Sequence, residues 1–173
     1  MKLNLLRLIY NLTTAALTQG DTMKRKPLAL ALALALACLI TTPSFAGTFE
    51  WTSGWGMGTS EYAVDDGNKN ALLISCPSEG YVSAEATIQG ERYDSESQPG
   101  FDLIVDGVTF SNPFYTDCRV CADIFKAQFW EAFRKANRLQ LSVDGQVVNL
   151  PTTKLQDVTQ PLDDPANGCY AAW

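Results

Sequence analysis

The chain contains no histidine among its 173 residues. Histidine is the base in the usual Ser-His-Asp and Cys-His catalytic arrangements and the commonest metal ligand, so those arrangements and every His-ligated metal site are excluded. The G-x-S-x-G turn of α/β-hydrolases and the S-x-x-K pair are also missing from the sequence. We therefore expect a protein that is not an enzyme and that needs no cofactor and no metal.

Basic residues are scarce after residue 46. Of the chain's 13 Lys and Arg, five lie in residues 1–46, whereas only one of its 19 Asp and Glu lies there; eight basic and 18 acidic residues remain, a net charge of −10. A surface this acidic repels nucleic acid and anionic lipid head groups, both of which are bound through Lys and Arg. The charge favours solubility or a basic protein partner, and no nucleic-acid binding is expected.

No apolar run is long enough to cross a membrane. The longest, residues 28–40, is shorter than the roughly 20 residues that a spanning helix needs. Three basic residues precede it, and Ser44-Phe45-Ala46 places small residues where a signal peptidase cleaves. We expect cleavage between Ala46 and Gly47, followed by a single exported domain of residues 47–173, periplasmic or secreted, with no stable membrane span.

Two features of this leader leave alternatives open. Met23 stands just before the basic triplet and is the expected functional start, so residues 1–22 need not be translated. Cys38 lies in a sequence that loosely fits a bacterial lipoprotein signal, in which this cysteine would be acylated. The apolar residues that follow Cys38 suit such a tether poorly, so cleavage after Ala46 is preferred.

Four cysteines remain after the predicted cleavage: Cys76, Cys118, Cys121 and Cys169. An even number in a short exported chain indicates disulfides, for which three pairings are possible. Cys118 and Cys121 are close enough in sequence to bridge each other, which leaves Cys76 for Cys169. We expect this pairing, in which the longer bridge ties an early strand to the C-terminal tail.

The local patterns predict mostly strands. Asp106-Gly107 and Asp144-Gly145 each separate two short apolar segments, which is typical of β-hairpins because tight turns require positive φ. Residues 71–76 fit a buried strand, residues 81–88 alternate as a half-buried strand does, and residues 90–100 are expected to form a polar loop. The expected fold is a β-rich α+β domain with an antiparallel, sandwich-like sheet.

One principal helix is expected over residues 121–136. Its apolar residues recur at helical spacing and form a single stripe, which consists of Ala122, Phe125, Phe129, Ala132, Phe133 and Ala136. We expect this stripe to supply core. Arg134 projects elsewhere, and Trp130 lies off the stripe, so Trp130 is predicted to be partly exposed and available to a partner.

The Cys118-Arg119-Val120-Cys121 motif just before this helix has a second interpretation. A helix N-terminus stabilises a thiolate, so the two cysteines could form the dithiol of an envelope thiol–disulfide redox protein. The hairpins on both sides differ from the βαβ frame of thioredoxin-like enzymes, and a structural bridge is preferred. A four-cysteine zinc site lacks a second C-x-x-C.

The first residues after the predicted cleavage site are rich in tryptophan and glycine. Trp51 and Trp55, with glycines at 54, 56 and 58, could form a platform for a small ligand or a glycan. Packing of both tryptophans in the core or at its edge is the commoner role of such residues. We keep Trp51, Trp55 and Trp130 as candidate contacts to a partner or ligand.

Several features follow one another over the last hundred residues: Leu72-Leu73-Ile74-Ser75-Cys76, Val105-Asp106-Gly107, residues 129–134, residues 136–143, and the late Cys169 with Trp173. This order resembles the VasI-type proteins linked to type VI secretion loci and the invasion-associated locus B family. The resemblance implies a periplasmic β-sandwich-like domain with Cys76 bridged to Cys169, which works by protein contact and has no catalytic residue. The expected function is therefore that of a non-enzymatic inhibitor, immunity or secretion-accessory protein.

Overall fold

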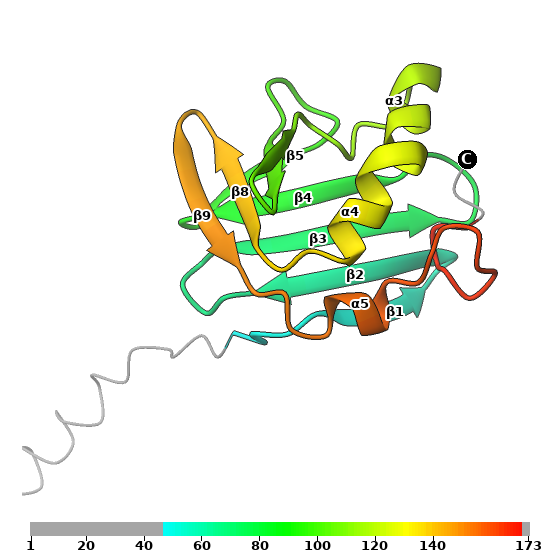
Figure 1. Ribbon diagram of the computed structural model, residues 1–173, viewed down its shortest axis with the longest axis horizontal. Coiled ribbons are helices and arrows are strands. Elements are labelled where there is room, and N and C mark those ends of the chain that lie inside the picture. The colour runs from blue at the N-terminus through cyan, green and yellow to red at the C-terminus, as the bar shows by residue number, and fades with distance from the viewer. Residues whose placement is uncertain (1–46, 171–173) are drawn as a thin grey trace, which may run out of the picture. The chain divides into compact units, whose positions relative to one another are not determined.

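Within residues 47–170, which the computed structural model describes, nine strands form two antiparallel sheets (Figure 1). The larger sheet runs in sequence order: β1 (Thr52–Gly56), β2 (Thr59–Asp65), β3 (Ala71–Pro77), β4 (Ser83–Ile88) and β5 (Glu91–Asp94). The smaller has the order β7 (Val108–Phe110), β6 (Asp102–Val105), β8 (Leu139–Val143) and β9 (Gln146–Leu150). The predicted β-rich α+β class is confirmed. The predicted leader, with Met23, Cys38 and Ala46, lies outside the described residues.

The core lies between the larger sheet and a second layer made of the smaller sheet and a helical segment, which crosses in front of the larger sheet in Figure 1. Aromatic contacts join the layers. The ring centroids of Trp51 and Phe133 are 5.3 Å apart and those of Tyr62 and Trp130 are 6.0 Å apart. On the side of the smaller sheet, Phe110 meets Phe129 at 5.2 Å. The helix therefore packs on both sheets.

Strand patterning follows the sequence closely in the centre of the larger sheet. Val82, Ala84, Ala86 and Ile88 are buried and the residues between them are not, so the predicted half-buried strand is confirmed as β4. Residues 71–76 form β3, in which every second side chain is buried. Alternation arises because successive side chains of a strand point to opposite faces.

Both Asp-Gly pairs form the tight turns predicted for them. Asp106 and Asp144 have φ of 50° and 49°, and Gly107 and Gly145 follow with φ of 92° and 79°. Positive φ at both central residues belongs to the turn whose twist matches that of paired strands. These turns close the hairpins β6–β7 and β8–β9 of the smaller sheet.

The expectation of a loop over residues 90–100 is wrong in its first part. Residues Glu91–Asp94 form the edge strand β5, which pairs with β4 from Glu85 to Ile88. The strand was not recognised because its side chains are mostly polar and exposed, as is common at a sheet edge that must avoid pairing with other chains. The strand β1 was missed for the same reason, since all five of its residues are exposed.

Asp106 also fixes the short segment that connects the helix to β8. Its carboxylate accepts the backbone N–H of Arg138 at 2.8 Å and that of Asn137 at 3.1 Å. The hydrogen bond from Arg138, and then that from Asn137, lowers the pKa of Asp106 below its ordinary value. The carboxylate thus links the β6–β7 turn to the segment that leads into β8.

A depressed pKa in the folded state predicts how stability depends on pH. Asp106 stabilises the fold above the pKa of the unfolded chain, and this contribution is lost as the pH falls through the folded pKa. Asp106→Asn, which tolerates positive φ, should therefore lower the melting temperature at pH 7 and lose this difference in strong acid. Urea or thermal melts at several pH values measure it, with Asp144→Asn at the equivalent turn as control. An effect of Asp106→Asn that is equal at all pH values would contradict the carboxylate's role.

The helical segment has three parts: α3 (Arg119–Ile124), a π-helical turn η2 (Phe125–Phe129) and α4 (Trp130–Arg134). It covers most of the predicted range of 121–136. Phe125, Phe129 and Phe133 are all 0 % exposed, so the predicted apolar stripe does supply core. Phe114, in the loop before the helix, contacts all three rings at 5.1 to 6.1 Å.

The predicted exposure of Trp130 is wrong. Trp130 is 0 % exposed, its ring lies 5.5 Å from Phe125 and 5.6 Å from Phe133, and its Nε1 donates to the carbonyl of Gln160 at 2.9 Å. The π-helical turn explains the error. Its wider i to i+5 spacing inserts an extra residue into the turn, so that Phe129 and the next residue both face the core. Trp130 cannot be a partner contact.

Arg134 is buried as well, contrary to the expectation that it projects away from the core. Its Nε donates to the carbonyl of Thr159 at 2.8 Å, and its Nη1 lies 3.4 Å from the carboxylate of Glu131. Lys135, which reaches Glu131 at 2.8 Å, is the main cause that lowers the pKa of this carboxyl group, ahead of Arg134. The guanidinium thus joins α4 to the end of α5 (Leu155–Val158).

No helix in residues 47–170 is both long and apolar enough to cross a membrane.

Candidate functional site

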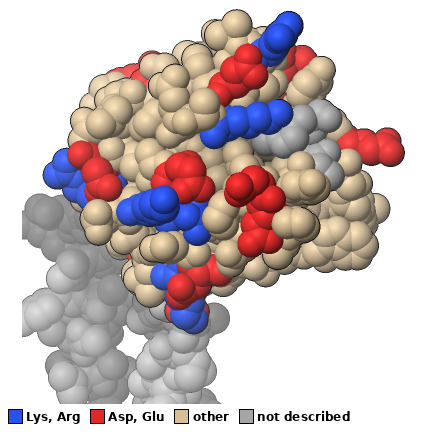
Figure 2. Space-filling model, turned by 45° about the vertical axis from the view of Figure 1, so that its right-hand side comes forward, with Lys and Arg blue, Asp and Glu red and all other residues tan. Residues whose placement is uncertain are grey.

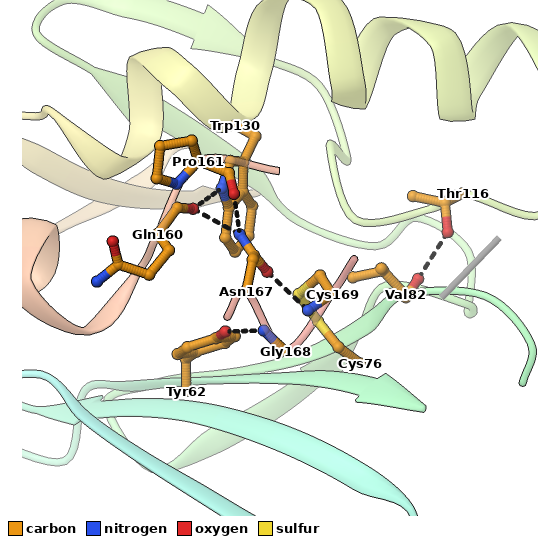
Figure 3. The surroundings of a disulfide bond; sticks show 10 residues. All are labelled: Tyr62, Cys76, Val82, Thr116, Trp130, Gln160, Pro161, Asn167, Gly168 and Cys169. Carbon is orange, nitrogen blue, oxygen red and sulfur yellow. Dashed lines mark hydrogen bonds between the residues drawn. A yellow bond between two sulfur atoms is a disulfide. The ribbon is translucent and has the colours of Figure 1, made fainter. Parts of the chain in front are cut away.

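The C-terminal tail is fixed on the larger sheet by a buried disulfide (Figure 3). Cys76 at the end of β3 bonds to Cys169, the Cα atoms are 4.9 Å apart, and both residues are 0 % exposed. The second disulfide joins Cys118 to Cys121 at the start of α3. The two pairs are those expected from the sequence.

Hydrogen bonds shape the tail around this disulfide. Asn167 donates through Nδ2 to the carbonyls of Gln160 and Pro161 and accepts the N–H of Cys169 through Oδ1 at 2.7 Å. Figure 3 shows Trp130 beside these groups, with its indole N–H on the Gln160 carbonyl. The tail is therefore held by side chains from α4 and β3 as well as by its own turns.

Tyr62 on β2 provides a further anchor. Its hydroxyl accepts the N–H of Gly168 at 2.8 Å, while its ring is buried. Burial raises the pKa of Tyr62 above its ordinary value, and the hydrogen bond from Gly168 acts in the opposite direction. Gly168 itself has no room for a side chain, because a Cβ there would collide with Ser60 of β2. The sequence offered only the Asn-Gly pair at 167–168 as a signal for this close approach.

The two tryptophans of the predicted platform lie in different environments. Trp51 is 1 % exposed, packs on Phe133, and donates through Nε1 to the carbonyl of Pro151 at 2.9 Å, so it belongs to the core. Trp55, in the edge strand β1, is 76 % exposed. The prediction of a shared Trp51–Trp55 platform is wrong, because Trp51 packs in the core just before β1 begins, whereas Trp55 lies in an edge strand whose residues are all exposed.

Besides Trp55, three more large apolar side chains are exposed at the same end of the larger sheet. Met57 at the tip of the β1–β2 turn is fully exposed, and Tyr81 and Tyr170 are 52 % and 51 % exposed. The register places Trp55 opposite Ser60 and Ser60 opposite Cys76, whose disulfide partner immediately precedes Tyr170. We call Trp55, Met57, Tyr81 and Tyr170 the Trp55 surface.

The loops that carry the Trp55 surface are joined to each other. The N–H of Ser78 in the β3–β4 loop donates to the carbonyl of Gly58 in the β1–β2 turn at 2.8 Å, which brings the loops of Tyr81 and Met57 together. Of these four residues, the sequence pattern indicated only Trp55 as a candidate contact. A large apolar residue directly beside glycine, as in Gly56-Met57-Gly58 and Gly80-Tyr81, is the signal that could have found two more, since such residues occupy exposed turns.

A shallow hollow adjoins Trp55, between β1 and the tail. It is lined by Ser53, Gly54, Trp55, Ser60, Tyr62, Val158, Ala166 and Gly168. Its floor is therefore set by the two anchors of the tail, Tyr62 and Gly168. This hollow can hold the side chain of a bound protein or one face of a small ring.

Acidic side chains are exposed at this end of the sheet. Glu61, which pairs with Gly54 of β1, is exposed, as is Glu79 in the β3–β4 loop. Figure 2 shows this end of the molecule, where both acidic and basic side chains are scattered among uncharged areas. Residues 47–170 contain no cluster of three or more residues able to hold a metal ion. The exposed apolar residues therefore have the carboxylates of Glu61 and Glu79 at the same end of the sheet.

No curated protein and no solved structure matches the chain. The family model that matches is YfjT, over residues 49–159, which is more than half of the chain. The match includes every strand and the whole helical segment, and it ends before Cys169. The chain belongs to the YfjT family.

Proposed function

We propose that this protein is exported, works in the periplasm, and binds another protein through the Trp55 surface, a contact that involves no catalysis. The inhibitor, immunity and secretion-accessory roles all fit this description. The observation that carries the proposal is the 76 % exposure of Trp55 on a strand whose neighbouring tryptophan is buried. Tryptophan and tyrosine are enriched at protein interfaces, where they contribute a large share of the binding free energy.

The backbone at Met57 supports the same surface. Met57 has φ of 50° and its side chain is fully exposed, although glycine or asparagine occupies such turn positions at lower cost. A methionine side chain adapts its shape to the surface that it contacts. A strained and solvated methionine next to an exposed tryptophan is explained if both are covered by a partner.

The partner is expected to present Lys or Arg around an apolar contact. Residues 47–170 contain 18 acidic and eight basic residues, and Glu61 and Glu79 lie beside the Trp55 surface. Opposite charges around an interface speed association and select the partner, and both effects weaken as salt is added. The binding rate should therefore fall with rising ionic strength.

Export is supported by the two disulfides. Disulfides persist in oxidising compartments such as the periplasm and are rare in the cytosol. The leader of residues 1–46, with its expected cleavage after Ala46, gives the route. The resemblance to VasI-type and invasion-associated locus B proteins is a separate reason to propose a role in protein contact.

The hollow beside Trp55 favours one alternative, a small-ligand or glycan-binding module. An exposed indole can stack on one face of a sugar ring, and the hydroxyl groups of Ser53 and Ser60 lie in the same hollow. Trp51 cannot contribute a second stacking surface, because it is buried. We therefore rank protein binding first and make the glycan an outcome of the test.

Site-specific photo-crosslinking in exporting cells tests the binding surface. A photoreactive residue at position 55 should yield discrete adducts with another protein, whereas one at Val147, which is 50 % exposed on β9, should not. Trp55→Ala should change the free energy of unfolding by no more than about 0.5 kcal/mol, as for other surface substitutions. It should also abolish adducts from a crosslinker at Tyr170.

Two results would contradict the proposal. One is an equal pattern of adducts from positions 55 and 147, which would indicate random encounters. The other is the absence of any protein adduct together with a shift of Trp55 fluorescence on adding oligosaccharides, which would favour the glycan-binding alternative.

A further inference from the structure

The Cys118–Cys121 disulfide plays no part in the proposed binding surface, and it differs from the other bridge in its accessibility. Cys76 and Cys169 are each 0 % exposed, so a thiol from solution cannot reach them in the folded protein. Cys118 is exposed and Cys121 is half-buried. Of the two bridges in the described residues, one can therefore react with an external thiol while the other stays closed.

The fold depends little on this exposed bridge. It joins residues only three apart, and α3 contributes no buried residue, since the buried aromatic residues of the helical segment begin at Phe125. Closing so short a loop restricts the unfolded chain much less than closing a long one. The bond can therefore open and close while the domain remains folded, which a redox-active pair requires.

A backbone hydrogen bond also favours a negative charge on one of the two sulfur atoms. Cys118 precedes α3, and its Sγ accepts the backbone N–H of Cys121 at 3.0 Å. When the S–S bond opens, the same N–H can donate to a thiolate at Cys118. The thiolate is both the attacking and the leaving species in thiol–disulfide exchange, so a donor at this sulfur favours exchange there.

A second hollow lies directly beside the disulfide. It is lined by Gln98, Pro99, Ser111, Asn112, Pro113, Tyr115, Cys121 and Ile124. Tyr115 and Ile124 are 36 % and 44 % exposed, and Val120, between the two cysteines, is 68 % exposed. Side chains of this kind suit a polypeptide with apolar residues better than a small polar thiol.

We propose that Cys118–Cys121 is a thiol–disulfide exchange site that oxidises a dithiol polypeptide bound in this hollow. A thiolate of the substrate attacks Sγ of Cys118; a mixed disulfide forms, the Cys118–Cys121 bond breaks, and Cys121 leaves as a thiolate that takes a proton from water. A second substrate thiolate then attacks the substrate sulfur of the mixed disulfide. The substrate disulfide forms and Cys118 leaves as a thiolate, so two electrons pass from the substrate to the pair.

Equilibration of the full exported protein in graded glutathione buffers is the first test. After acid quenching and alkylation, peptide mapping should show that Cys118–Cys121 opens while Cys76–Cys169 stays closed, with circular dichroism unchanged. If the exposed pair opens only together with the buried pair, under conditions that unfold the protein, it is a structural bridge and the proposal is overturned.

Trapping of the mixed disulfide is the second test. Cys121→Ser leaves Cys118 free and should form an adduct with an oxidised single-cysteine peptide that has apolar neighbours roughly tenfold faster than Cys118→Ser does, because Cys118 is the accessible sulfur. Equal trapping rates in the two variants would remove the assigned roles.

A substitution in the hollow tests whether the polypeptide binds there. Tyr115→Ala should slow trapping of the apolar peptide severalfold while leaving the rate with oxidised glutathione unchanged, because only the peptide extends into the hollow. The control variant Val147→Ala, at an exposed position of β9 outside the hollow, should change neither rate. If Tyr115→Ala slows both reagents equally, the hollow does not bind the polypeptide and the proposal of a polypeptide substrate fails.

Discussion

Phe129→Ala is expected to unfold this domain or to bring it close to unfolding. The Phe129 ring is 0 % exposed and contacts Phe110, Phe114, Phe125 and Phe133 at centroid distances of 5.1 to 5.6 Å. Truncating a buried phenylalanine costs about 3–5 kcal/mol, and small domains have total stabilities of about 5–15 kcal/mol. Thermal and urea melts of the exported protein measure the loss directly.

The matched control is Gln128→Ala, one residue earlier in the same π-helical turn. Gln128 is exposed, so its truncation should change the free energy of unfolding by no more than about 0.5 kcal/mol. Trp130→Ala should resemble Phe129→Ala and not Gln128→Ala, because it removes a buried indole and its hydrogen bond to Gln160. A variant Trp130→Ala as stable as the parent would mean that the helix does not turn this side chain into the core.

The second large effect is expected from the loss of the buried disulfide. The Cys76–Cys169 bridge closes a loop with a sequence separation of 93, whereas Cys118–Cys121 closes one of 3. On the chain-entropy model the two bridges contribute about 4–5 and about 2 kcal/mol respectively. The double variant Cys76→Ala/Cys169→Ala should therefore be far less stable than Cys118→Ala/Cys121→Ala, which should remain folded.

Loss of the Cys76–Cys169 disulfide should also disturb the Trp55 surface. Cys169 fixes the tail on β3, and the tail supplies Ala166 and Gly168 to the hollow beside Trp55 as well as Tyr170 to the surface itself. Crosslinks from position 55 should weaken in Cys76→Ala/Cys169→Ala even under conditions in which the sheets stay folded. Equal stabilities of the two double variants would show that the entropy of the unfolded chain does not govern the effect.

The sequence by itself determined the features that arise from neighbouring residues. The Asp-Gly turns at 106–107 and 144–145, the alternation in β4 and the phenylalanine spacing in the helix all depend on the local geometry of strands, turns and helices. The cysteine pairing was also within reach, because the short spacing of Cys118 and Cys121 left one partner for Cys76. These features were sufficient for the fold class.

Part of the candidate surface was likewise visible in the sequence. Trp55 was singled out for its type and its glycine neighbours, but nothing in its local sequence distinguished it from Trp51. Both are tryptophans at the start of the domain. Trp51 packs on Phe133 before β1 begins, whereas Trp55 lies in the exposed edge strand β1. Met57, Tyr81 and Tyr170 belong to the surface because loops distant in sequence meet at one end of the sheet.

Tertiary packing alone decided the burial of Trp130 in the helix and the path of the tail. The π-helical turn brings Trp130 beside Phe129, an arrangement that a regular helical period cannot predict. Gly168 is needed where it is because a strand more than a hundred residues earlier passes too close for a side chain. Short-range periodicity therefore determined the elements, and contacts between distant segments determined which of their faces remained open to a partner.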